Sequence, residues 1–243
     1  MKTKVALVTG SNKGIGKAIA DRLEQSGMIV VRNGRSVCPD PEHAGMVRCP
    51  DPKQEYVRGD VGTKWGRRRI ASHILTEHGQ LDVLVNNAAH TELIEHSNLP
   101  ELTEERFDRM YNVNLKGPFL LTTQLHSSLI QSDSPNIINI ASVAGTTGNG
   151  SNIAYCALKA GLINMTKSLA RSLAPIRVNA ISPGLIDTTF VDWSEEDISD
   201  IVSKTPVNRI GDPEDIADAV MSVLDMEYLT GQNITVDGGR TLN

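Results

Sequence analysis

A glycine-rich turn between an apolar run and a helical pattern constrains the fold of this chain most. Residues 5–8 are apolar, residues 18–24 have an amphipathic helical pattern, and the turn between them contains Gly10, Gly14 and Gly16. With the second apolar run at residues 28–31, this makes a βαβ unit, whose crossover is right-handed. The spacing G-x-x-x-G-x-G differs from the commoner G-x-G-x-x-G, and such a turn can also serve as a plain connection. Between strand and helix, it predicts a backbone that approaches a pyrophosphate closely at a helix N-terminus.

Apolar runs and helical patterns continue to alternate along the chain. We expect further strands at residues 56–60, 81–86, 137–140, 176–181 and 233–236, and helices at residues 64–78, 103–129, 154–173, 195–204 and 213–224. Because no repeat or linker interrupts this alternation, it predicts one domain, residues 1–243, of the α/β class. Its core would be a doubly wound parallel sheet, a Rossmann fold of about seven strands with helices on both faces. Four prolines between residues 38 and 52 argue against a helix there, so we expect an irregular loop.

Composition excludes several classes of function. The net charge of -5 gives no electrostatic reason to expect nucleic acid or an anionic membrane as partner. No apolar stretch approaches the roughly 20 residues that a membrane helix needs. The basic run at residues 67–69 is expected on the wet face of a helix. The three cysteines form no C-x-x-C pair, which favours reduced thiols and a cytoplasmic location. We expect no metal site, because Cys38, His43 and Cys49 come nearest to a ligand set and lack a fourth member.

Tyr155 and Lys159 form a candidate acid/base pair. They are four residues apart in a helical pattern, which places the phenol and the ammonium one turn apart on the same face. A fixed positive charge beside a phenol lowers its pKa from about 10, towards values suited to proton transfer near neutral pH. The plainer alternative is a half-buried tyrosine beside a solvated lysine.

The end of the second strand indicates which dinucleotide would bind. An acid that holds a ribose 2'-hydroxyl would lie about 20 residues after the glycine turn. The sequence there, residues 32–36, contains no carboxylate and two arginines. Arg35 could pair with a 2'-phosphate, and Lys13 in the turn adds a second cation. This pattern favours NADP(H) over NAD(H), although both side chains could also be ordinary surface charges.

Several motifs occur in a fixed order along the chain. They are Thr9-Gly-x-x-x-Gly14-Ile15-Gly16, Asp60-Val61, Asn86-Asn87-Ala88-Ala89, Asn114, Ser142, Tyr155-x-x-x-Lys159, and Pro183-Gly184 followed by Thr188. Their order and separations resemble the short-chain dehydrogenase/reductase family from end to end, in the branch of the 3-oxoacyl-acyl-carrier-protein reductases. One departure is Ala89, where the family usually has glycine.

The resemblance implies two sets of site residues. The catalytic set would be Asn114, Ser142, Tyr155 and Lys159, with Tyr155 as acid/base, Ser142 orienting the substrate oxygen, and Lys159 holding the nicotinamide ribose and lowering the pKa of Tyr155. The cofactor would contact both Tyr155 and Lys159 and the residues Gly10, Ser11, Asn12, Lys13, Gly14, Ile15, Gly16, Arg35, Asp60, Val61, Asn87, Ala88, Pro183, Gly184, Ile186 and Thr188.

Helix geometry also suggests a role for the backbone carbonyl of Asn114. In an α-helix the N–H of residue i bonds the carbonyl of residue i-4, and Pro118 has no N–H. The Asn114 carbonyl would therefore be free to hold a water linked to Lys159, which is the relay role that the resemblance implies. The alternative is that Pro118 only bends the helix for packing.

The expected reaction is hydride transfer between nicotinamide and a carbonyl or secondary alcohol. Two alternatives are a 3-oxoacyl-acyl-carrier-protein reductase and a non-catalytic NADP(H)-binding regulator; an epimerase or dehydratase would need a longer substrate domain. The helix ends at residues 131–134 and 172–175 suit an acidic carrier poorly, so we favour a free small molecule. The expected pocket is neutral and mostly apolar, with Ala144, Thr147, Asn152, Leu185, Phe190 and Trp193. The resemblance also implies a homotetramer, formed through the helices near residues 101–131 and 154–173 and the C-terminal strand.

Overall fold

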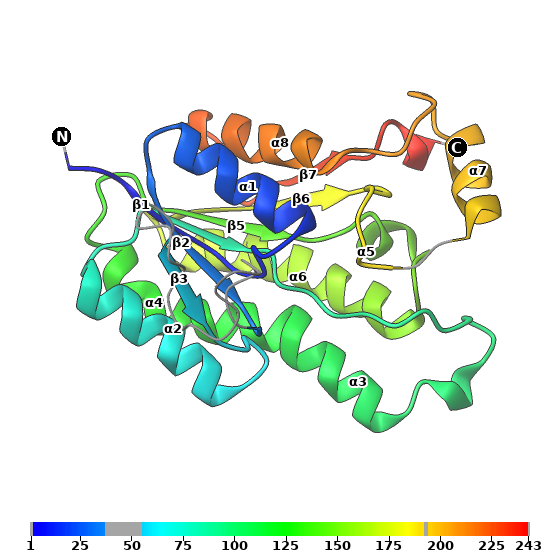
Figure 1. Cartoon of the computed structure of the whole chain (residues 1–243), viewed down its shortest axis with the longest axis horizontal. Helices are drawn as coiled ribbons and strands as arrows, with labels where there is room; N and C mark the ends of the chain where they lie inside the picture. The colour runs from blue at the N-terminus through cyan, green and yellow to red at the C-terminus, as the bar shows by residue number, and fades with distance from the viewer. Residues whose placement is uncertain (1, 37–54, 192–193, 243) are drawn as a thin grey trace, which may run out of the picture.

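The computed structural model describes residues 2–36, 55–191 and 194–242, and its centre is one parallel sheet (Figure 1). The strands follow the order β3-β2-β1-β4-β5-β6-β7. Their bounds are β1 Val5–Val8, β2 Ile29–Gly34, β3 Glu55–Arg58, β4 Val83–Asn86, β5 Asn136–Ile140, β6 Arg177–Pro183 and β7 Asn233–Val236. Every neighbouring pair is parallel, as between β1 and β4, where Leu7 lies opposite Leu84. This confirms the predicted doubly wound α/β fold.

Helices cover both faces of the sheet, because alternate strand residues point to opposite sides. Val5 and Leu7 of β1 join one hydrophobic cluster, while Ala6 and Val8 join the other. The first cluster includes residues of α2 (Lys64–Glu77), α4 (Gly117–Leu129) and α6 (Ile153–Ser172). The second includes residues of α1 (Gly14–Gln25) and α8 (Pro213–Asp225), and Figure 1 shows these two helices side by side above the sheet. Each face thus has its own apolar core.

Helix boundaries follow from local chemistry in several places. Thr103 caps α3 (Glu104–Tyr111), and its side chain accepts the backbone N–H of Arg106. Pro213 occupies the first position of α8, where its missing N–H costs nothing. Ser194 caps α7 (Glu195–Ser203) in a reciprocal capping box with Asp197. The remaining helical pieces were not predicted and are short: η2 (Leu99–Glu101), α5 (Ala144–Thr147) and η4 (Arg240–Leu242).

The long helix expected from residue 103 to residue 129 is wrong in one respect. A π-helical segment, η3 (Asn112–Lys116), separates α3 from α4. The Gly117 N–H donates to the carbonyl of Asn112, five residues back, and Pro118 has no N–H to give to Asn114. A Cβ on Gly117 would lie 2.9 Å from the Asn112 carbonyl oxygen and equally close to that of Val61. Glycine therefore permits the widened turn to pack against the residues after β3.

Arg67 corrects the interpretation of the basic run as solvated. Its side chain is buried at 4% exposure, and Nη1 donates to the Val61 carbonyl at 2.7 Å. Arg69 instead lies over the ring of exposed Trp65. The expected loop at residues 38–52 lies outside the described residues. Among those described, no helix combines the length and apolarity required to cross a bilayer.

Candidate functional site

The glycine turn lies between β1 and β4, at the point where the order of strand addition reverses: β2 and β3 lie on one side of β1, and β4 to β7 lie on the other. Helices from these two strands leave on opposite faces, so a crevice opens at their carboxyl ends. Gly10 and Gly14 have φ angles of +66° and +55°, which L side chains rarely adopt. A Cβ on Gly16 would lie 2.4 Å from the Gly10 carbonyl oxygen. The three glycines therefore let the chain turn tightly into α1, whose N-terminus faces the crevice.

Thr9 and Asn87 hold this turn against the end of β4. The Thr9 hydroxyl accepts the backbone N–H groups of Asn87 and Ala88, each at 3.0 Å. The Asn87 side-chain amide donates to the carbonyls of Thr9 at 2.8 Å and Gly10 at 3.1 Å. Asn87 thus shapes the turn through its side chain. Thr9 was missed as a site residue, although its position directly before the first glycine was a usable signal.

The middle of the turn is tied to β2. Ser11 and Asn33 exchange hydrogen bonds, with the Asn33 N–H donating to the Ser11 hydroxyl at 2.9 Å. The Asn12 amide nitrogen donates to Ser36 and to the phenol oxygen of Tyr56, both at 3.1 Å, while its buried Oδ1 has no partner among the described residues. These contacts fix the turn beside the residues that follow β2.

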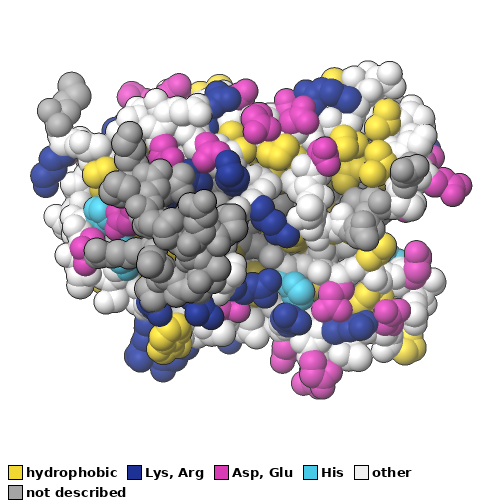
Figure 2. All heavy atoms as spheres, in the orientation of Figure 1, with side chains coloured by type: hydrophobic (Ala, Val, Ile, Leu, Met, Phe, Trp, Pro, Cys, Tyr) yellow, Lys and Arg dark blue, Asp and Glu magenta, His cyan; other side chains and the backbone are white. Residues whose placement is uncertain are grey.

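Two cations flank the entrance of the crevice. Lys13 precedes α1 and its ammonium donates to the Thr189 hydroxyl at 2.8 Å. Arg35 directly follows β2, is exposed, and has no carboxylate partner among the described residues. Arg32 is buried and bound to Asp21 at 2.6 Å and to Glu24 at 2.9 Å, so its charge is already compensated. Figure 2 shows Lys and Arg side chains in the middle of this face, near the start of α1.

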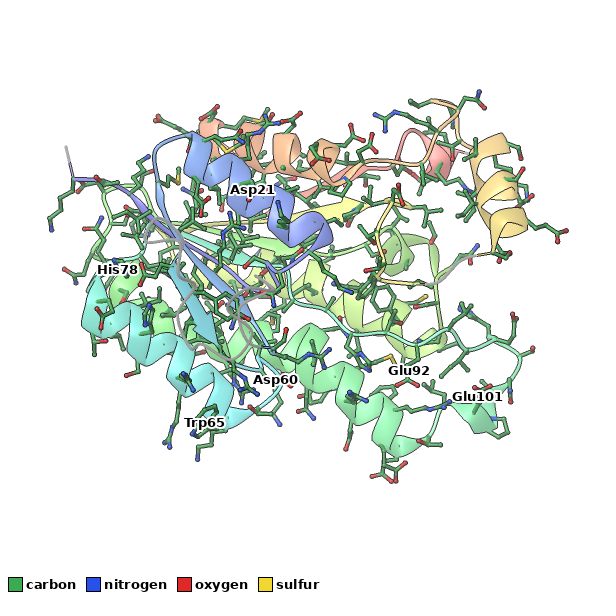
Figure 3. The ribbon with its side chains drawn as sticks, viewed as in Figure 1. Asp21, Asp60, Trp65, His78, Glu92 and Glu101 are labelled. Carbon is green, nitrogen blue, oxygen red and sulfur yellow. The ribbon has the colours of Figure 1, made fainter. Side chains whose placement is uncertain are left out.

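Asp60 and Val61 follow β3 at the same edge of the sheet. The Asp60 carboxylate accepts the backbone N–H of Gly62 at 2.8 Å, which closes a local turn. Val61 is buried in the core cluster that contains Val113. The Val61 side chain therefore packs in the core, behind the residues that border the crevice. Figure 3 shows Asp60 beside the start of α2.

Tyr155 and Lys159 lie on α6, whose first turn is capped by Asn152. The side-chain Oδ1 of Asn152 accepts the Tyr155 N–H at 2.8 Å, and its side-chain amide nitrogen donates to the Glu92 backbone carbonyl at 2.8 Å. The cap thus links α6 to the segment after β4. Lys159 is buried at 2% exposure; its ammonium donates to the Ile140 carbonyl at 2.7 Å and lies 5.6 Å from the centre of the Tyr155 ring.

Burial dominates the acid/base properties of this pair. It raises the pKa of the Tyr155 phenol above its ordinary value, and a hydrogen bond with Ser142 opposes the shift only in part. Burial also lowers the pKa of Lys159 from 10.5 to about 7. The net shift of the Tyr155 pKa is therefore upward, where the sequence predicted a lowering, because desolvation outweighs the other contributions to it.

Ser142 is half-buried after β5, and its hydroxyl accepts the N–H of Ala144 at 3.1 Å. The short helix α5 then packs on α6, because a Cβ on Gly145 would lie 2.7 Å from the Ala160 nitrogen. This close approach brings the serine from β5 to the tyrosine of α6. The ring of exposed Phe190 lies beside Tyr155, with the two ring centres 6.3 Å apart.

Asn114 lies in the π-helical segment and is buried. Its side-chain amide donates to the His90 carbonyl at 2.7 Å and to the Met110 carbonyl at 2.9 Å, while its Oδ1 accepts the His90 N–H at 3.2 Å. All three contacts use the side chain, so the backbone carbonyl is left out of them. The segment η3 packs against α6, where Leu115 lies 3.3 Å from the position of a Cβ on Gly161.

The loop after β6 completes the crevice. The N–H of Gly184 donates to the Val236 carbonyl at 2.9 Å, and the Pro183 carbonyl accepts the Val143 N–H at 3.0 Å. Ile186 is buried and forms a parallel bridge with Gly211. Thr188 approaches the glycine turn, with Cγ2 3.1 Å from the position of a Cβ on Gly14. Ile15 faces the second core cluster.

Known proteins resemble this chain over its full length. Residues 10–241 match the family model described as Enoyl-(Acyl carrier protein) reductase. The 3-oxoacyl-[acyl-carrier-protein] reductase FabG of Thermotoga maritima is 36% identical, and the match covers 98% of both chains. The chain belongs to the short-chain dehydrogenase/reductase family.

Other relatives agree with this assignment. A protein of Streptomyces violaceoruber named as a ketoacyl reductase of the granaticin polyketide synthase is 38% identical, over 98% of this chain and 96% of its own length. The solved structure of an apo SCOR enzyme from Clostridium thermocellum has a TM-score of 0.84 at 31% identity, covering 100% of this chain and 94% of that one. A short chain dehydrogenase from Bacillus anthracis has a TM-score of 0.83 at 29% identity, with 99% and 97% covered.

Two polar residues of this short-chain dehydrogenase/reductase site had no predicted role. His90 is held by Asn114 through its backbone, and its ring lies 3.4 Å from the Glu92 carboxylate. Burial and the charge of Arg109 lower the pKa of His90, and Glu92 opposes the shift. Glu92 also pairs with Arg106 at 3.1 Å. No sequence motif marks either residue, because the two contacts to Asn114 and Arg106 connect segments far apart in the chain.

Proposed function

We propose that this protein is an NADP(H)-dependent oxidoreductase that interconverts a carbonyl and a secondary alcohol, with Tyr155 as the general acid/base. The observation that carries the proposal is the meeting of Ser142, Tyr155 and buried Lys159 at the carboxyl edge of the sheet. Two hydroxyl donors suit an oxygen acceptor, which a carbonyl has and an isolated carbon–carbon double bond lacks.

The residues would divide the work of carbonyl reduction. Ser142 and Tyr155 hydrogen-bond the carbonyl oxygen and stabilise its developing negative charge, and Tyr155 donates its proton to that oxygen. The bound cofactor supplies the hydride. Lys159 returns a proton to Tyr155, and a water held by the backbone carbonyl of Asn114 connects Lys159 to solvent. A raised Tyr155 pKa keeps the acid protonated at neutral pH, which suits the reductive direction.

The chain offers a cradle that fits a dinucleotide. Gly10, Gly14 and Gly16 would let the backbone approach the pyrophosphate, with the N-terminus of α1 facing its charge. Ile15 would join the glycines at the phosphates and ribose, with Ser11 and Asn12 beside them. Asp60 and Val61 would lie near the adenine, Asn87 and Ala88 along the edge of β4, and Pro183, Gly184, Ile186 and Thr188 beside the nicotinamide. Oδ1 of Asn12, which has no partner in the described part of the chain, would be an acceptor in this cradle.

The charge of Arg35 supports NADP(H) over NAD(H). Arg35→Asp should lower the ratio of kcat/KM for NADPH to that for NADH by roughly 10- to 100-fold, because an ion pair with the 2'-phosphate is replaced by repulsion. Arg68→Asp makes the same change of charge at an exposed position of α2 and should leave the ratio unchanged. Steady-state kinetics with both cofactors measures it, and a wild type without preference for NADPH contradicts the assignment.

Tyr155→Phe tests the chemistry itself. The variant should lose nearly all turnover, since the proton donor is gone, while fluorescence titration still shows NADPH binding. Tyr228→Phe, at a fully exposed tyrosine, is the matched control and should keep wild-type activity. The substrates would be a panel of diketones, quinones, sugars and a 3-oxoacyl thioester. Turnover retained by Tyr155→Phe refutes the proposed role, and no turnover of any carbonyl by the wild type favours a non-catalytic regulator.

The substrate is proposed as a free small molecule, with a 3-oxoacyl group on acyl carrier protein as the second candidate. The names of the FabG relatives favour the second. The helix ends favour the first, because the segment after α4 carries Asp133, and Ser132 there is bonded to Asp82. Comparing kcat/KM for one 3-oxoacyl group on a short thiol and on the carrier protein separates the two.

The oligomeric state and the cellular location are also proposed. We propose a homotetramer, supported by exposed apolar side chains on α3 and α4 and after α8. A cytoplasmic location is supported by Cys156, which is a free, buried thiol.

A further inference from the structure

Glu55, His73 and His78 converge at the amino end of β3, away from the proposed active site. Period-two alternation puts Glu55 on the same face of the strand as Val57, which packs with Ile70 and Ile74 of α2. His73 lies on α2 between Ile70 and Ile74 in the sequence. In Figure 3, His78 is at the end of α2 far from Glu92, which borders the crevice.

The end of α2 turns the second imidazole back towards the first. His78 caps the helix with φ -120° and ψ -36°, and Gly79 follows with φ +69°. Both N–H groups donate to the Ile74 carbonyl, at 3.1 Å and 3.0 Å. The chain therefore leaves the helical path at His78, and the rings of His73 and His78 meet edge to face with centres 6.4 Å apart.

Both rings present the same nitrogen to one carboxylate. His73 Nε2 contacts Glu55 Oε1, and His78 Nε2 lies 3.1 Å from Oε1 and 3.0 Å from Oε2. The candidate ligand atoms all lie within 4.8 Å of one another. The side chains are 20%, 13% and 28% exposed for His73, His78 and Glu55, so an ion could enter from solvent. No lysine or arginine among the described residues pairs with this carboxylate.

We infer that Glu55, His73 and His78 form a zinc-binding site. Two imidazoles and one carboxylate are an established ligand set for Zn²⁺, with a water in the fourth position. Zn–N and Zn–O bonds of about 2.0–2.2 Å separate tetrahedral ligand atoms by about 3.4 Å. The separations of 3.1 Å and 3.0 Å between His78 and Glu55 approach this value, and the His73 ring would move back from Oε1 to admit the ion. The ion would tie the first residue of β3 to the end of α2. Sequence spacing does not reveal this set, because Glu55 and His73 are 18 residues apart.

Calorimetric titration of the metal-free, full-length protein with Zn²⁺ tests the site, with Mg²⁺ as the comparison ion. We expect one Zn²⁺ per chain, no Mg²⁺, and a rise in Tm on adding Zn²⁺. His78→Gln and Glu55→Gln should each weaken zinc binding by about 100-fold or more, exceeding the loss typical of outer-shell changes. His126→Gln, on α4, should bind zinc like the wild type. Equal affinity in all four proteins, or no binding by the wild type, overturns the proposal in favour of a plain hydrogen-bonded cluster.

The cobalt-substituted protein identifies the ligand atoms. Co²⁺ in this site should give visible d–d bands without a thiolate-to-cobalt charge-transfer band, because the ligand set has no sulfur. A thiolate band means that cysteines hold the metal, and it overturns the assignment. Circular dichroism of Glu55→Gln, which keeps the size of the side chain and an acceptor for the imidazoles, establishes that loss of binding is not loss of fold.

Discussion

Lys159 is an ammonium group buried in the core of the site, and its burial has a measurable consequence. Its pKa is lowered to about 7, against an ordinary value of 10.5. Between these two values the unfolded chain binds a proton that the folded chain releases. The free energy of unfolding therefore rises with pH from about 7 to about 10.5, and at lower pH the fold carries a desolvated charge. If Lys159 has the proposed catalytic role, its position costs stability in this way.

Lys159→Met removes this cost, and its effect should depend on pH. The variant should gain most, relative to the wild type, near pH 6, where the wild-type lysine is charged. The advantage should shrink by about 2 kcal/mol between pH 7 and pH 9, because each pH unit is worth about 1.4 kcal/mol. Urea unfolding of both proteins without cofactor at each pH measures the difference. The same difference at pH 6 and at pH 9 would show that Lys159 titrates as in the unfolded chain.

Helix α6 shows what the sequence can predict about a structural element. The four-residue spacing of Tyr155 and Lys159 indicated one helix face, and the structure confirms the helix. The spacing does not give burial, which depends on α5 packing onto α6 through Gly145. The plainer alternative of a solvated lysine is therefore wrong, and so is the expected lowering of the Tyr155 pKa. Tertiary packing decides whether desolvation, which raises the pKa of Tyr155, outweighs a neighbouring positive charge, which lowers it.

The elements between α3 and α4 show the same limit. The missing N–H of Pro118 predicted a defect in the helix, but a kink and a π-helical turn both leave the Asn114 carbonyl without that donor. The structure has the π-helical turn, because Gly117 fits between the carbonyls of Asn112 and Val61. Arg67 was placed in solvent for a related reason: a run of three basic residues does not show that one of them turns inward and donates to the Val61 carbonyl, six residues earlier.

At the scale of the whole molecule, the two ends of the sheet carry different chemistry. The carboxyl ends hold the candidate active site, where the predicted motifs meet because every strand runs parallel. The amino end holds the proposed zinc site, which none of the sequence motifs predicted. The order of the motifs along the chain therefore predicted the fold and the first site together, while the second site depends on how one helix ends.

The proposed tetramer depends on the exposed apolar surface of α3 and α4. Phe107 and Tyr111 lie one turn apart on α3 and are 41% and 38% exposed, and Phe119 on α4 is 45% exposed. Covering such side chains with another copy of the chain would remove apolar area from water.

Light scattering should give a mass of about four chains of 26.3 kDa each. Phe107→Glu combined with Tyr111→Glu should yield smaller assemblies, since a buried carboxylate without a partner opposes association. Trp65→Glu, at an exposed position in the first turn of α2, should keep the mass of the wild type. A wild type with the mass of one chain would contradict the tetramer, and unchanged mass in the double variant would place the interface elsewhere.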